Sequence, residues 1–182
     1  DNVGISNSGV LESTGGTLTI DPALPLVTLN NVGTVEANGG ELDITNEPVT
    51  NTGTLQAINN STLKLTSTTV TNTGGTVSDG AGSTIDLING SIIGGALSGA
   101  GVIGTATGNA ASTLNGVTLA SGTKVTAAVG TLNLTGSIAA AGAEIDANSG
   151  PGIAVDLESL ILVGAILGGL GNPLGAVAGA VL

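Results

Sequence analysis

The sequence predicts an all-β protein, a right-handed parallel β-helix (β-solenoid) with about 20–24 residues and three short strands per coil. The first observation is a recurring phrase whose leading asparagines, Asn7, Asn31, Asn51 and Asn72, are spaced by 24, 20 and 21 residues. The second is composition, with 32 Gly and no aromatic residue. A period near twenty that is rich in turn residues is typical of stacked coils, and a narrow coil interior does not need aromatic side chains to fill it.

The strands of each coil follow from alternation of polar and apolar residues, which is the pattern of short half-buried strands. The clearest alternation is in segments 17–20, 41–44, 62–65 and 84–87. A second predicted strand lies upstream in each repeat, at Val10–Leu11, Val35, Leu55 and Val77. A third lies downstream, at 27–29, Val49, Val70 and Ile92–Ile93. Three strands per coil predict a triangular cross-section.

Asparagine and glycine mark the corners between these strands, since both residues accept left-handed backbone geometry. Asparagines at the same corner of successive coils can also stack, each amide donating to the next side-chain carbonyl. We therefore predict a structural ladder of Asn7, Asn31, Asn51 and Asn72.

The repeat becomes less regular after residue 90, although segments 113–115, 117–119 and 131–134 and residues Val125, Ile138 and Ile145 still resemble strands. We divide the chain into a β-solenoid over residues 1–152 and an apolar, Gly- and Ala-rich segment over 153–182 that serves assembly or capping. The apolar residues expected to serve assembly are Leu160, Ile161, Leu162, Ile166, Leu167, Leu170, Leu174 and Val177. The glycines, Pro173 and the lack of a basic flank argue against a membrane span there.

Charge excludes further classes of partner. The net charge is −11 and there are only two Lys and no His or Cys. Nucleic acid is not an expected partner because its backbone must be neutralised by basic residues. No catalytic, cofactor-binding or metal-binding residue is predicted, and the calcium-binding nonapeptide of β-rolls is absent.

The strand alignment also predicts two columns of outward side chains. Alignment of the strands places Thr19, Asp43, Lys64, Asp86 and Asn133 in one column, so we expect cross-coil ion pairs of Lys64 with Asp43 and Asp86. Alignment also places Thr17, Thr62, Thr84, Thr113 and Thr131 in a threonine column, which raises the alternative of an ice-binding face. Glu41 interrupts that column, so the threonine array is not regular.

The repeat also resembles a known family. The run N-x-G-[TV]-[VLI]-x-A followed by G-x-L-x-[IL], together with segments 90–103 (GSIIGGALSGAGVI) and 112–122 (STLNGVTLASG), resembles passenger repeats of bacterial autotransporter and filamentous haemagglutinin-type adhesins. The resemblance covers roughly residues 1–150. It implies a parallel β-helix, secretion, and a role in adhesion or matrix at or beyond the bacterial cell surface.

We expect a non-enzymatic structural subunit of an extracellular filament or adhesive fibre. The strand pattern has already begun at Val3 and Ile5 without a capping helix, and the chain ends in an apolar segment, which together favour head-to-tail stacking of identical subunits. The alternative is a fragment of a monomeric cell-surface adhesin stalk that binds host or matrix glycans.

Overall fold

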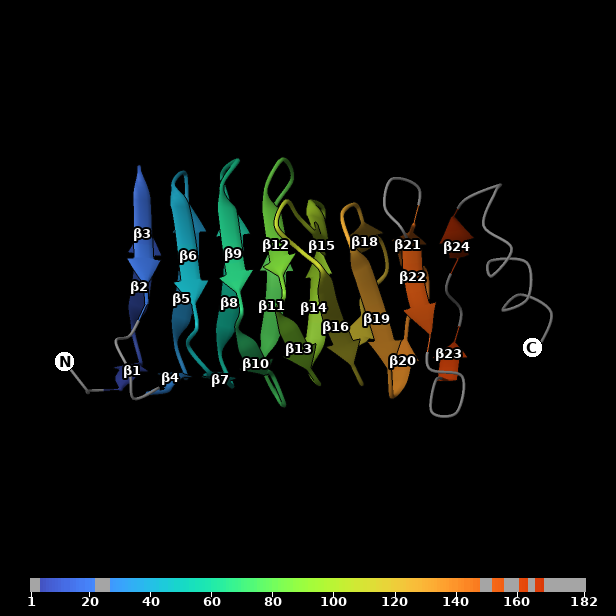
Figure 1. Cartoon of the computed structure of the whole chain (residues 1–182). Helices are drawn as coiled ribbons and strands as arrows, with labels where there is room; N and C mark the ends of the chain where they lie inside the picture. The colour runs from blue at the N-terminus through green and yellow to red at the C-terminus, as the bar shows by residue number, and fades with distance from the viewer. Residues whose placement is uncertain (1–3, 22–26, 148–151, 156–160, 164–165, 169–182) are drawn as a thin grey trace.

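The computed structural model of the chain is a stack of coils, each of which contributes one short strand to each of three sheets (Figure 1). The structure describes residues 4–21, 27–147, 152–155, 161–163 and 166–168. Every sheet has eight strands, the strand pairs are parallel, and neighbours in a sheet come from successive coils. The predicted β-solenoid with three strands per coil is therefore confirmed.

Each sheet forms one face of the stack. Sheet 1 contains β1 (Ile5–Asn7), β4 (Leu29–Asn31), β7 (Val49–Asn51), β10 (Thr69–Thr71), β13 (Ser91–Ile93), β16 (Ala111–Asn115), β19 (Thr131–Thr135) and β22 (Gly152–Val155). Sheet 2 contains β2 (Val10–Ser13), β5 (Thr34–Asn38), β8 (Thr54–Ile58), β11 (Thr76–Asp79), β14 (Ala96–Gly99), β17 (Thr118–Leu119), β20 (Ser137–Ala139) and β23 (Ile161–Val163). Sheet 3 contains β3 (Thr17–Ile20), β6 (Glu41–Thr45), β9 (Thr62–Thr66), β12 (Thr84–Ile88), β15 (Val102–Thr105), β18 (Lys124–Ala127), β21 (Glu144–Asp146) and β24 (Ile166–Gly168).

The core is a set of aliphatic columns that run along the stack. In sheet 3, for example, Leu42, Leu63, Ile85 and Ile103 are paired in register and are fully buried. Their sequence neighbours on the strands point outward, because side chains alternate between the two faces of a strand. Full burial of one such side chain contributes about 1.5–3 kcal/mol, so a column stabilises the stack without any aromatic residue.

Glycine is required where the corners of successive coils approach each other. A Cβ atom at Gly33 would clash with the backbone of Gly9, and one at Gly53 would clash with the backbone of Gly33. These glycines follow Asn7, Asn31 and Asn51 by two residues, so the N-x-G phrase encodes a close-packed corner.

The last coil includes part of the apolar tail. Strand β22 pairs with β19, β23 with β20, and β24 with β21, all in parallel (Figure 1). Leu162 is in register with the buried Ile138, and Leu167 with the buried Ile145. The predicted boundary after residue 152 therefore falls inside β22, and the coil pattern continues to Gly168. Leu160, Leu170, Leu174 and Val177 lie outside the described residues.

Candidate functional site: polar ladders and the open coil edge

The predicted asparagine ladder is present at the corner between sheet 1 and sheet 2. Asn7 donates from Nδ2 to Asn31 Oδ1 over 2.8 Å, Asn31 donates to Asn51 Oδ1 over 2.7 Å, and Asn51 donates to Asn72 Oδ1 over 2.7 Å. Asn31, Asn51 and Asn72 are buried. The side chains satisfy one another inside the corner, which is the condition for burying an amide without a free-energy penalty.

Each ladder amide also serves the backbone. Asn31 Nδ2 lies 3.2 Å from the carbonyl oxygen of Gly33 in its own coil and 2.9 Å from that of Thr54 in the next coil. The ladder ends at Asn72, whose Nδ2 lies 3.3 Å from the Gly94 carbonyl oxygen, because glycine occupies that corner in the next three coils, at Gly94, Gly116 and Gly136. The ladder therefore holds together the first coils of the stack and not the later ones.

A second set of asparagine hydrogen bonds, which was not predicted from the sequence, connects later coils at another corner. Asn109 accepts from the Asn89 backbone amide over 2.9 Å and from Ser112 Oγ over 2.7 Å. Its Nδ2 donates to the Val129 carbonyl oxygen over 2.9 Å. The sequence does mark this corner, with an Asn-Gly pair that begins at Asn89 and a Gly-Asn pair that ends at Asn109. Both pairs lie where the repeat is irregular, so they do not stand out as a ladder.

The charged column on sheet 3 has the predicted register but a different contact. Strand pairing places Lys64 between Asp43 and Asp86. The Lys64 ammonium, however, forms its ion pair with Glu41 Oε2 at 2.6 Å. Glu41 lies one coil away and two residues from Asp43, within reach of the long lysine side chain. Lys64 therefore contacts Glu41 directly. Asp43 and Asp86, its predicted partners, attract it over a longer distance.

Three residues assigned to sheet 3 columns from the sequence lie elsewhere. Asn133 is on β19 and Thr113 on β16, and both belong to sheet 1. Thr131 also begins β19 in sheet 1, so it does not extend the column of Thr17, Thr62 and Thr84. These three residues were assigned to the wrong sheet because the repeats that contain them lack the N-x-G phrase that sets the alignment of the earlier repeats.

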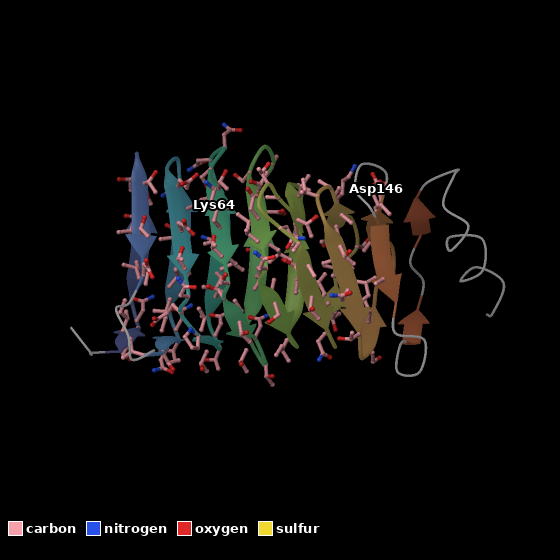
Figure 2. The ribbon with its side chains drawn as sticks, viewed as in Figure 1. Lys64 and Asp146 are labelled. Carbon is pink, nitrogen blue, oxygen red and sulfur yellow. The ribbon has the colours of Figure 1, made fainter. Side chains whose placement is uncertain are left out.

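Sheet 3 also holds the second lysine. Figure 2 shows Lys64 and Asp146 on coils far apart in the stack. Lys124 lies 3.6 Å from Glu144 Oε1 and 3.9 Å from Asp146 Oδ2. Both lysines of the chain thus lie on the outward face of this sheet, surrounded by carboxylates.

The surroundings of Lys64 alter the ionisation of the column. The hydrogen bond to Glu41, helped by the charges of Asp43 and Asp86, raises the pKa of Lys64 above its usual value despite partial desolvation. Burial raises the pKa of Asp86, and its hydrogen bond to Thr84 and the nearby Lys64 charge partly offset this effect. Lys64 is charged at neutral pH, so it attracts carboxylates on the coils before and after its own and stabilises the stacking of three coils.

Replacement of Lys64 by alanine is expected to lower the free energy of unfolding by up to about 1 kcal/mol, because three carboxylates lose a partly exposed cation. The loss should shrink as salt is raised, since exposed charges are screened. Urea unfolding at low salt and at 0.5 M salt measures both effects, because the Debye length at 0.5 M salt is about half its value at physiological salt. An equal loss at both salt concentrations would mean that the lysine stem, not its charge, stabilises the column.

Two acids lie on the inside of the coil and were not predicted. Asp79 is 5 % exposed and accepts from the Gly101 amide over 3.1 Å, while its Oδ2 has no hydrogen-bond partner. A Cβ at Gly99 would clash with this carboxyl group and with the backbone carbonyl of Asp79, so glycine there makes room for both. Burial raises the pKa of Asp79 to about 6, against the lowering effect of the Gly101 amide. Burial also raises the pKa of Glu47, which is 1 % exposed.

The first coil presents an open edge in the described part of the chain. β1, β2 and β3 each lie at the end of a sheet and pair with a described strand on one side only. The inward residues Ile5, Leu11 and Leu18 are only partly buried, whereas their register partners Leu29, Val35 and Leu42 are fully buried. Within the described residues, the outer backbone groups of β1, β2 and β3 face no further strand, and the core is only partly covered there.

The described residues contain no group of three or more metal-ligating side chains, and no described helix is long and apolar enough to cross a membrane. Comparisons with protein-family models, curated proteins and solved structures found no match. The resemblance to passenger repeats therefore rests on the repeat pattern of the sequence, and the functional argument rests on the coil geometry.

Proposed function

We propose that this protein is a non-enzymatic structural subunit of an extracellular filament or adhesive fibre, assembled by head-to-tail stacking of its β-solenoid. The supporting observation is the open edge of the first coil. All three sheets reach it with the same parallel polarity, so one further coil with the same register extends all three at once. Such a contact between identical subunits is heterologous and produces an open filament when the rotation does not close.

The ladder supports the same contact. Asn7 Oδ1 accepts the Gly9 amide of its own corner over 3.2 Å, and no described asparagine donates to it from the outer side. The other three ladder oxygens each receive an Nδ2 group from the preceding coil. A donor on the polar corner of an incoming coil could therefore bond to Asn7 Oδ1 in the same way as each ladder amide bonds to the next ladder oxygen.

The backbone at Val10 offers a sharp test. The Gly9 carbonyl oxygen accepts from the Thr34 amide over 2.8 Å, on the side of β5. In a trans peptide the C=O and the next N–H point in opposite directions, so the Val10 N–H points toward the open edge. Val10 is also 63 % exposed and begins β2, a position where proline is tolerated in an edge strand.

The Val10→Pro substitution removes this outward donor without removing a hydrogen bond between β2 and β5. We expect head-to-tail association to weaken about tenfold or more, which corresponds to losing about 1–3 kcal/mol at the contact. Circular dichroism and the urea midpoint of the dispersed protein should remain close to those of the wild type. The matched control is Val10→Ala, which keeps the amide and should assemble like the wild type.

Electron microscopy of the 182-residue chain at micromolar concentration is the direct readout. Thin filaments whose subunits repeat every 35–40 Å, roughly eight coil spacings of about 4.8 Å, are expected. Dispersed short rods under all conditions would contradict the filament proposal and favour the monomeric adhesin stalk. Filaments of Val10→Pro equal in length to those of Val10→Ala would show that the β2 edge is not the contact.

A further inference from the structure

Among the described residues, the outward positions of one sheet, sheet 1, carry no charged side chain. Most of the described outward residues of sheet 1 form two columns in register, and we call these two columns the uncharged face. The first column is Ser6, Asn30, Thr50, Thr71, Ile93, Asn115 and Thr135. The second column is Thr69, Ser91, Thr113, Asn133 and Ala154. All of these side chains are short, and all except Ile93 and Ala154 carry a hydroxyl or an amide.

Charged residues occupy the other two faces instead. The outward positions of sheet 3 hold both lysines and five acids, Glu41, Asp43, Asp86, Glu144 and Asp146. Sheet 2 holds Glu12 and Glu36 at outward positions. With a net charge of −11, two copies of the chain repel each other, and sheets 2 and 3 bring like charges closest. The repulsion is smallest when two copies approach through sheet 1.

The uncharged face is also complementary to itself. Hydroxyl and amide side chains both donate and accept, so identical faces can bond across a two-fold axis, whereas a face dominated by carboxylates cannot. The hydroxyls of Thr69 and Ser91 already lie 3.2 Å apart along the second column. Two flat sheets with short side chains pack face to face at a separation of about 10 Å.

We propose that the uncharged face is a lateral interface, on which a second copy of this chain docks face to face. Three to five residues per strand and eight strands give roughly 400–500 Å² per partner, about half of the ~800 Å² of a standard stable interface. Single rods thus pair weakly, and rods already joined end to end pair firmly because the area multiplies. In that respect the inference rests on the proposed filament, and it adds that the filaments are paired.

Disulfide trapping tests the lateral contact on single rods as well as on filaments. The chain has no cysteine, so single cysteines can be introduced without a competing thiol. The scan uses Asn30→Cys, Thr71→Cys and Asn115→Cys along the first column, because one of them must lie nearest the two-fold axis. The control is Ser78→Cys, which lies on β11 in the same coil as Thr71 but faces outward from sheet 2.

Mild oxidation at micromolar concentration should give cross-linked dimers of at least one sheet 1 variant in several-fold higher yield than Ser78→Cys. Sheet 1 yields that never exceed that control would overturn the lateral interface, whatever electron microscopy shows of the filaments. Cross-linking of dispersed rods without filaments would instead support the lateral contact and contradict head-to-tail stacking. In filaments, Thr71→Asp should separate paired filaments into single ones of unchanged subunit repeat; unchanged pairing would contradict the proposal.

Discussion

Replacement of Asn31 by alanine is expected to lower the free energy of unfolding by about 3 kcal/mol or more. The side chain is buried and donates to Asn51 Oδ1 and to the carbonyl oxygens of Gly33 and Thr54. Its removal also leaves Asn7 Nδ2 without its side-chain acceptor. The cost is larger than that of one hydrogen bond because several buried polar groups lose partners at once. Urea unfolding, followed by circular dichroism, measures the loss.

The neighbouring Asn30 is a control of the same residue type on the same strand. It faces outward and is exposed, so Asn30→Ala should change stability by no more than about 0.5 kcal/mol. Similar losses for the two variants would mean that β4 responds to any substitution and that the ladder has no special role. A further check is Asn31→Asp, which keeps an acceptor but loses the donors, and it should not restore stability.

The coil architecture could be predicted because its causes are local and repeated. Alternation in segments such as 41–45 sets which residues face inward, and the N-x-G phrase at Asn31 places both the ladder and the close-packed corner. Each feature recurs at the same offset, so an error in one coil is corrected by its neighbours. The predicted strands after residue 90 were found for the same reason, even where the asparagine had been replaced by glycine.

The contacts that sequence reasoning missed depend on three-dimensional detail that a period does not contain. Strand register correctly placed Lys64 between Asp43 and Asp86, but the reach of a flexible lysine decides which carboxylate it contacts, and it contacts Glu41. Asp79 occupies an inward position where the same column of sheet 2 has Ala37 and Ala57. Only the structure reveals that Gly99 makes room for both the backbone carbonyl and the carboxyl group of Asp79.

The buried Asp79 should make the stability of the coil depend on pH. Its pKa is about 6 in the folded state, above the ordinary value of 3.8, so the folded state binds this proton more tightly than the unfolded state. The contribution of Asp79 is therefore most favourable below about pH 4 and is lost as the pH rises through 6. The difference amounts to on the order of 3 kcal/mol at pH 7.5.

Asp79→Asn keeps the size of the side chain and an oxygen for the Gly101 amide but does not titrate. The free energy of unfolding of the wild type, minus that of Asp79→Asn, should therefore fall by on the order of 3 kcal/mol between pH 4 and pH 7.5. Taking the difference cancels the titration of the other acids and any constant cost of the substitution. Ser78→Ala, at the adjacent outward position, should give a difference that is constant with pH. If the Asp79→Asn difference were constant as well, the carboxyl group would have to be hydrated in the folded coil.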